Sequence, residues 1–169
     1  MHPSALIQPH TLRLLLLVLY STGRRAGEAR RWRYGDVDLR DRIRTIWDTT
    51  CFKSRLVPIG TQLCAVIARY GTERAHVPLA DGDRSIFFAS RTGQAISLGR
   101  LEHALTRLLR QTRVGQGDTG HRPRLHDLRA TCAVHRLIAW YREGAEVQAR
   151  LPLLSTYLGH VNVSATSTY

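Results

Sequence analysis

Five side chains that lie far apart in the sequence have the types that a phosphodiester-breaking site needs: Arg25, His126, Arg129, His160 and Tyr169. Two arginines can hold the non-bridging oxygens of a phosphate, because each planar guanidinium donates parallel hydrogen bonds. A tyrosine phenol can then attack phosphorus, which gives a covalent phosphotyrosine instead of free, hydrolysed ends. Together these residues predict an active site for nucleic acid that uses no metal.

Each of these residues lies in a short motif. Arg25 lies in the segment 22–28 (TGRRAGE), His126 and Arg129 form His-x-x-Arg, and His160 ends Leu-Gly-His nine residues before Tyr169. Taken separately, a solvated arginine, a structural histidine and a terminal tyrosine are the commoner explanations. The joint order and spacing of the motifs favour the functional interpretation. The remaining histidines show no metal-ligand spacing, so no metal site is predicted.

The charge of the chain points to a phosphate-rich partner. Its 169 residues include 25 basic and 13 acidic side chains, which gives a formal net charge of +12 and a pI near 10.9. Lys53 is the only lysine, and the arginine fork suits bidentate phosphate contacts better than an ammonium does. A GC-rich coding sequence would explain arginine in place of lysine, but not the excess of positive charge. Nucleic acid is therefore the expected partner.

The cysteines and the apolar runs limit the cellular context. Cys51, Cys64 and Cys132 are odd in number and lack paired spacing, so neither a disulfide framework nor a zinc site is indicated. The apolar run 14–19 is too short to span a bilayer. We expect a protein of the reducing cytoplasm that binds no membrane.

These candidate residues must be positioned by one domain, which we predict to be α+β and mostly helical. A buried helix over 11–21 should end near Gly23, and a second short helix should begin close to Arg25. Segments 43–47 and 55–59 favour an antiparallel hairpin with Lys53 near its tip, and segment 85–88 is expected to add a third strand.

Three further segments complete the predicted domain. Leucine-rich periodicity favours amphipathic helices around 63–70 and 101–109. A long helix should carry His126 and Arg129 at its start, where the helix dipole favours a bound anion. The polar stretch 112–124 predicts an exposed loop, and its Arg122 and Arg124 are candidate contacts to a DNA phosphate backbone.

These four pieces resemble the catalytic domain of the tyrosine recombinase (phage integrase) family, from about residue 12 to Tyr169. The amino-acid sequences of segments 53–58 (KSRLVP) and 151–160 (LPLLSTYLGH) look most like those of transposon-associated integrases. The resemblance implies a helical catalytic domain with a small three-stranded antiparallel sheet, the fold of DNA breaking-rejoining enzymes. It also implies site-specific recombination or integration of double-stranded DNA, with no cofactor, in a bacterial cytoplasm.

The resemblance also implies a role for each site residue. Arg25 and Arg129 would clamp the scissile phosphate, and His160 would donate to it. His126 would assist proton movement near the attacking phenol or hold the phosphate from the other side. Tyr169 would be the nucleophile, and Glu28 would have a structural role that fixes Arg25 or a neighbouring backbone group.

The chain departs from the family pattern at the general acid. Aligning on segment 55–58 puts Thr50 where the family has its catalytic lysine, and Lys53 matches a second basic residue. A mobile hairpin tip could still bring Lys53 to the leaving group. The His-x-x-Arg motif also continues with Ala130 where a second histidine is usual.

The ends of the chain also depart from the family pattern. We expect residues 1–169 to be a single catalytic domain that lacks the amino-terminal core-binding domain and the carboxyl-terminal tail of its relatives. A terminal carboxylate beside the phenol of Tyr169 would oppose phenolate formation, so we expect a fragment or truncated product. Relatives act as oligomers on DNA, but this chain is expected to be a monomer in solution.

Two alternatives to an active recombinase stay open. A decayed or truncated recombinase would grip DNA through the same basic face without cutting it, and Thr50 and the terminal Tyr169 favour that hypothesis. A type IB topoisomerase relative would share the chemistry but relax supercoils, although the transposon-like wording argues against it.

Overall fold

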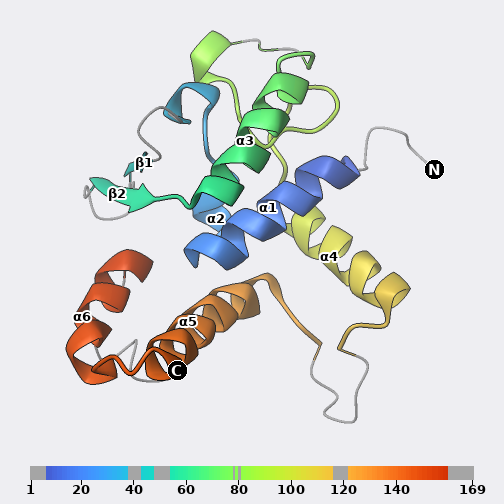
Figure 1. Cartoon of the computed structure of the whole chain (residues 1–169). Helices are drawn as coiled ribbons and strands as arrows, with labels where there is room; N and C mark the ends of the chain where they lie inside the picture. Colours follow the sequence, from blue (N-terminus) through green and yellow to red (C-terminus); the bar gives the residue numbers. More distant parts are fainter. Residues whose placement is uncertain are drawn as a thin grey trace.

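The protein is described here from a computed structural model, which defines residues 7–37, 43–47, 54–77, 79, 81–115 and 122–159. Figure 1 shows that helices make up most of this part of the chain, together with one small hairpin. The prediction of a mostly helical architecture is confirmed.

Helix α1 (Pro9–Thr22) runs through the middle of the molecule (Figure 1). Pro9 stands in its first turn, where a missing N–H is harmless because that group would have no partner within the helix. Gly23 ends the helix in the left-handed conformation, with a φ of 61°, as the sequence predicted. One face of the helix lies in the main core and buries Leu14, Leu15, Val18 and Leu19.

The short helix α2 (Ala26–Ala29) follows directly, with Arg25 as its N-cap residue. The backbone amides of Glu28 and Ala29 both donate to the carbonyl oxygen of Arg25, at 3.0 and 3.1 Å. A single turn of 3-10 helix, η2 (Tyr34–Asp36), follows α2. The predicted short helix is therefore present, and α2 places Glu28 back over Arg25.

The predicted hairpin is formed by strands β1 (Ile43–Trp47) and β2 (Ser54–Pro58), which pair antiparallel. In the register of this pair, Ile43 faces Pro58 and Trp47 faces Ser54. The hairpin is confirmed to within one residue at each boundary. Its tip, which includes Thr50 and Lys53, lies outside the described residues.

The third strand predicted at 85–88 is not found among the described residues. Ile86 forms only an isolated bridge with Arg33, and the Phe87 amide donates to the Trp32 carbonyl at 2.7 Å. Phe87 and its neighbour Phe88 are both buried, at 1% and 0% exposure. In a strand with one solvent-facing side, buried and exposed side chains alternate. Two consecutive buried side chains do not fit that pattern, and the segment packs into the core instead of extending the hairpin.

Helices α3 (Thr61–Arg74) and α4 (Leu98–Thr112) cover the main core, and a 3-10 turn, η3 (Gly82–Arg84), precedes the buried aromatic segment. Tyr70 packs edge-on against Phe87, with ring centroids 5.1 Å apart. The hydroxyl of Tyr70 donates to the Phe87 carbonyl at 3.2 Å, and burial raises the pKa of this phenol. Both helices confirm predictions made from leucine periodicity.

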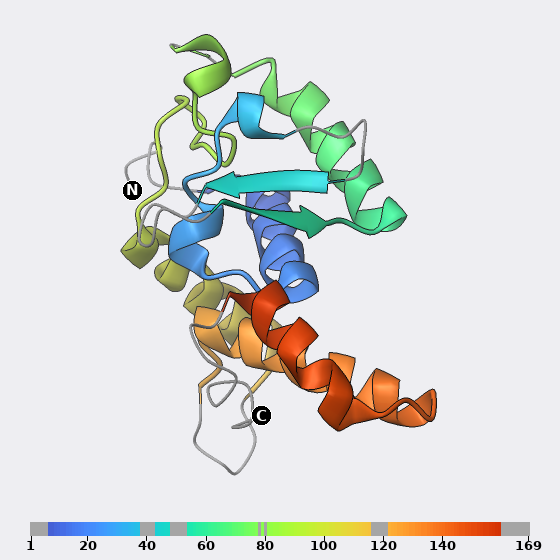
Figure 2. The same ribbon diagram turned by 90° about the vertical axis from the view of Figure 1, so that its left-hand side faces the viewer.

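Helices α5 (Leu125–Arg142) and α6 (Val147–Leu158) lie at one edge of the molecule, and the chain reverses direction between them, as Figure 2 shows best. They enclose a second, smaller apolar cluster of Ala133, Leu154 and Leu158. Helix α5 confirms the predicted long helix. No element was predicted at 147–158, and α6 forms there although Pro152 lies inside it, a residue that disfavours a helix interior.

None of the helices within the described ranges has the length and hydrophobicity needed to cross a bilayer.

Candidate active site

The segment from Gly23 to Arg25 joins α1 to α2 and packs against the end of α6. A β-carbon on Gly23 would overlap Leu158 Cδ2 and would lie 3.4 Å from the Cys132 sulfur. Glycine is therefore required here both by its positive φ and by the closeness of α5 and α6. The arginine motif and the chain that leads into Leu-Gly-His thus lie in direct contact.

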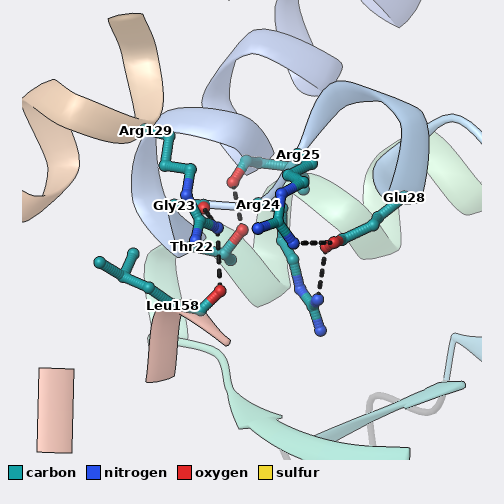
Figure 3. Close-up of polar contacts among 8 residues, drawn as sticks. Thr22, Gly23, Arg24, Arg25, Glu28, Arg129 and Leu158 are labelled. Carbon is teal, nitrogen blue, oxygen red and sulfur yellow. Dashed lines mark hydrogen bonds and ion pairs between the residues drawn. The ribbon is translucent and has the colours of Figure 1, made fainter. Parts of the chain in front are cut away.

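Arg129 joins three of the motifs predicted from the sequence. Its side chain is buried, at 1% exposure, and one terminal nitrogen donates both to the Gly23 carbonyl at 2.7 Å and to the Leu158 carbonyl at 2.9 Å (Figure 3). These acceptors lie two residues before Arg25 and two residues before His160. The guanidinium therefore fixes the arginine motif and the end of α6 to the start of α5.

Glu28 receives two arginines at once, as Figure 3 shows. Its Oε2 accepts from Arg24 at 2.6 Å and its Oε1 accepts from Arg25 at 3.2 Å. The Arg25 side chain is half exposed, whereas Arg24 is 1% exposed. The contact between Glu28 and Arg25 that the sequence suggested is present, and Arg25 keeps a solvent-facing side on which an anion could bind.

His126 occupies the first turn of α5 and is exposed. The turn is fixed by Asp127, whose carboxylate accepts from the Arg124 backbone amide at 2.8 Å. Arg122 and Arg124 are both exposed in the segment before the helix, where each could reach a phosphate. Because Arg129 follows His126 by three residues, the two lie on adjacent positions of one helix face.

The other predicted site residues lie outside the described part of the chain. These are Lys53 and its alternative Thr50 in the hairpin tip, together with His160 and Tyr169. Gly159, the residue before His160, caps α6 in the left-handed conformation with a φ of 75°. The structure thus joins Arg25 to Glu28 and connects Arg129 to the Gly23 carbonyl, two residues before Arg25. The positions of the undescribed residues, and the convergence of the five side chains on one phosphate, stay predictions.

A cavity of about 590 Å³ opens beside this arrangement, between the end of α1 and the start of α3. Thr22 and Tyr157 line it together with the cation of Arg136. Within the described residues, no cluster of three or more histidine, cysteine or acidic side chains could hold a metal ion. The guanidinium groups of Arg136, in this cavity, and of the half-exposed Arg25 are each able to hold an oxyanion.

No role was predicted for Arg24. Its only signal in the sequence is its place between Gly23 and Arg25. The buried pair with Glu28 shows that it belongs to the site.

A sequence model of the Phage integrase family matches residues 4–169, nearly the whole chain. The chain belongs to the phage integrase family. Family membership explains why the motifs at 22–28, 126–129 and 158–160 lie so far apart in sequence and yet converge on Arg129.

Two curated members of the phage integrase family illustrate the relationship. A putative integrase/recombinase y4rB of Sinorhizobium fredii is 36% identical over 163 residues, which are 96% of this chain and 52% of that protein. Tyrosine recombinase XerC 2 of Ralstonia nicotianae is 29% identical over 157 residues, 93% of this chain and 41% of that protein. The chain spans about half the length of the curated relatives it matches.

A solved structure shows that the fold is also that of the family. The XerH site-specific recombinase, bound to its difH substrate in a pre-cleavage complex, matches with a TM-score of 0.70 at 20% identity. The match covers 99% of this chain and 43% of that recombinase. At this level of identity the likeness concerns the fold alone.

Proposed function

We propose that this chain is the catalytic domain of a tyrosine recombinase, which recombines or integrates double-stranded DNA at specific sites through a 3′-phosphotyrosine intermediate. The proposal follows from membership of the phage integrase family and from the order of the four motif pieces, 22–28, 126–129, 158–160 and Tyr169. The remaining half of such a protein would share in the selection of the DNA sequence, because phosphate contacts position a protein while base contacts specify.

One observation carries this proposal: the buried guanidinium of Arg129 donates to carbonyls of both the arginine motif and the Leu-Gly-His segment. An arginine on the surface would not connect two segments that lie more than a hundred residues apart in sequence. A site that holds one phosphate from several sides requires such a connection, because catalytic groups act only when they are fixed in position.

The chemistry assigns a role to each residue around the phosphate. Arg25 and Arg129 offset the negative charge that grows on the equatorial oxygens in the transition state, and His160 donates to the same group. The Tyr169 oxygen forms a bond to phosphorus while the bond to the 5′ oxygen breaks. His126 assists proton movement beside the phenol.

The departing 5′ oxygen must gain a proton, and we assign that step to Lys53 because Thr50 occupies the usual position of the family lysine. A threonine hydroxyl is a poor acid near neutral pH, whereas an ammonium group loses a proton far more readily. Because the bond energy is conserved in the phosphotyrosine linkage, the proposed reaction needs no cofactor.

A row of basic residues on α4 supports DNA binding outside the reacting centre. Four exposed positions spaced for one helix face carry basic side chains: Arg100, His103, Arg107 and Arg110. The opposite face buries Leu101 and Leu105. We propose that this row follows a phosphate backbone, as do Arg122 and Arg124, so binding should weaken steeply with salt.

We further propose a bacterial cytoplasmic protein, monomeric alone and oligomeric on DNA.

Covalent capture tests the proposed function without knowledge of the target site. The chain, and a version extended by its flanking reading frame, are incubated with a randomised pool of nicked duplexes. The nick lets the short 5′ product diffuse away after attack, so a protein-DNA adduct accumulates and survives denaturing electrophoresis. Sequencing the captured strands then gives the target.

Tyr169→Phe should abolish the adduct, because it removes the attacking oxygen. Tyr141→Phe is the matched control, since Tyr141 is 80% exposed on α5 and should leave capture unchanged. An adduct that survives Tyr169→Phe would show that another residue is the nucleophile. If both lengths of protein bind the pool but yield no adduct, the protein is a DNA-binding relative that has lost cleavage.

A further inference from the structure

Arg24 and Arg25 are neighbours in sequence, yet they meet the same carboxylate from different environments. Arg24 is buried to 1% exposure, and its partner Glu28 is 18% exposed. The Arg25 side chain is 50% exposed. Both can reach Glu28 because the single turn of α2 folds that residue back over the Arg25 carbonyl. The result is a row of charges that begins inside the protein and ends at solvent.

The order of these charges matters for an anion that approaches from outside. A carboxylate paired with Arg25 alone would cancel the positive charge that Arg25 offers to a phosphate. The buried guanidinium of Arg24 supplies the opposing charge for Glu28 at 2.6 Å, so the group of three carries one net positive charge. That net charge is located on Arg25, the solvent-facing member.

The same contacts fix geometry. The carboxylate of Glu28 is held through Oε2 by Arg24, which leaves Oε1 to hold Arg25 at 3.2 Å. Charge-assisted hydrogen bonds of this kind are short and directional. A guanidinium that is oriented before the phosphate arrives loses less freedom on binding than one that is free to rotate.

We propose that Arg24 is a positioning residue for the reaction: it holds Glu28 in place and neutralises it, so that Arg25 meets the phosphate oriented and with its charge uncancelled. Arg24 itself does not touch the phosphate. The inference rests on the proposed role of Arg25 in holding the scissile phosphate, and it assigns that role a second, buried arginine.

The first test measures anion binding and needs no cleavage. Inorganic phosphate is titrated into the ¹⁵N-labelled chain, and the Arg25 Nε–H signal is followed by NMR after assignment with Arg25→Lys. Arg24→Leu should weaken phosphate binding about fivefold, because Glu28 then loses the charge of Arg24 and offsets more of the charge of Arg25. The double variant Arg24→Leu with Glu28→Gln should recover affinity to within about twofold, since no uncompensated carboxylate remains.

That rescue separates positioning from a merely structural role. If Arg24 only supported the fold, removing Glu28 as well would leave binding as weak as in the single variant, or weaker, and the proposal would be overturned. Arg31→Leu is the matched control, because Arg31 is an exposed arginine just after α2 and its removal changes the net charge equally. It should leave the titration unchanged.

The second test measures cleavage. On the captured duplex, Arg24→Leu should slow single-turnover adduct formation at saturating DNA by at least about tenfold, while DNA affinity should fall by no more than the roughly fivefold loss expected with phosphate. Arg24→Lys keeps the charge without the fork, so it should restore phosphate affinity and only part of the rate. If Arg24→Leu does not fold, Arg24→Lys serves as the test variant. A wild-type rate for Arg24→Lys would show that Arg24 does not orient Arg25.

The two tests fail in different ways. If the wild-type protein forms no adduct with any duplex, the proposed function fails while the phosphate titration still decides whether Arg24 tunes Arg25. If the adduct forms normally in Arg24→Leu, the proposed function stands and the role of Arg24 is refuted.

Discussion

The main core differs from the junction at which Gly23, the end of α6 and Arg129 meet. Different interactions hold the two regions together. The main core buries large apolar side chains, and Phe87 packs edge-on against Phe88 with ring centroids 5.2 Å apart. The junction has a small apolar cluster around Leu154 and Leu158, and it depends on hydrogen bonds from Arg129 and on the close fit at Gly23. The chain that leads into His160 is therefore positioned by polar and steric precision more than by burial.

Two buried arginines make this difference concrete. Arg74 is 2% exposed and donates to the carbonyls of Val77 and Ile86, so it closes a loop within its own part of the core. Arg129 is as deeply buried, but its acceptors lie in α6 and in the α1–α2 connection. The same chemistry stabilises a fold in one place and assembles a site in the other.

Exchanging each arginine for leucine should give the largest effect and should separate these two roles. Arg129→Leu should lower the rate of adduct formation by about a hundredfold or more, since it removes a donor to the phosphate and releases Leu158. Arg74→Leu should lower the free energy of unfolding by about 3 kcal/mol, because buried carbonyls lose their donors. Urea unfolding and single-turnover capture measure the two quantities.

The rate for Arg74→Leu must be expressed per folded molecule, and it should then equal that of the wild type within about twofold. If Arg74→Leu slowed the reaction as much as Arg129→Leu does, the distinction between the two regions would be lost. A normal rate for Arg129→Leu would remove this residue from the proposed active site.

Much of the main core could be predicted from the sequence because its elements have local signals. The leucine run and Gly23 gave both ends of α1, and strand patterns gave the hairpin to within one residue. The third strand failed because Phe87 and Phe88 are drawn into the core by contacts distant in sequence. Helix α6 was missed because packing against α5 outweighs the local cost of Pro152.

The sequence names candidate residues for the site but does not indicate their geometry. The spacing of motifs named Arg25 and Arg129, but no local pattern indicates that Arg129 donates to two carbonyls instead of facing solvent. The burial of Arg24 was equally invisible, since it depends on how α2 returns Glu28 toward the turn. Such contacts join segments that the sequence presents as independent.

A methyl group at Gly23 should disturb the junction more than the same change elsewhere. Gly144 also has a positive φ, of 69°, but a β-carbon there would meet nothing within 4 Å. Gly144→Ala should therefore cost about 1 kcal/mol of backbone strain. Gly23→Ala adds the overlap with Leu158, which raises the loss to about 3 kcal/mol. Thermal unfolding measures both, and hydrogen exchange should show the extra loss in α6 amides.

Shortening Leu158 tests whether the overlap is the cause. In a double-mutant cycle of Gly23→Ala and Leu158→Ala, the combined loss should be smaller than the sum of the separate losses by about 1 kcal/mol. Strict additivity would mean that Gly23 matters only for its backbone conformation. Equal losses for Gly23→Ala and Gly144→Ala would lead to the same conclusion.

The alkylation rate of Cys132 reports how often the junction opens and exposes this thiol. Its sulfur lies beside Gly23, and burial raises the pKa of this thiol above its ordinary value of 9.0, outweighing the lowering effect of Arg136 and Arg129. Because a raised pKa disfavours the thiolate, alkylation at pH 8 should be at least about tenfold slower than in urea, and it should accelerate as the pH rises above 9.

The measurement uses iodoacetamide on a Cys51→Ser, Cys64→Ser background, so that each modified protein reports Cys132. Adding Gly23→Ala should speed labelling about threefold, because a junction that opens more often exposes the thiol. Gly144→Ala should leave the rate unchanged, although it strains the backbone to a similar degree. If both glycine variants accelerated labelling equally, the thiol would be reporting global unfolding, and the junction would be no weaker than the main core that surrounds Phe88.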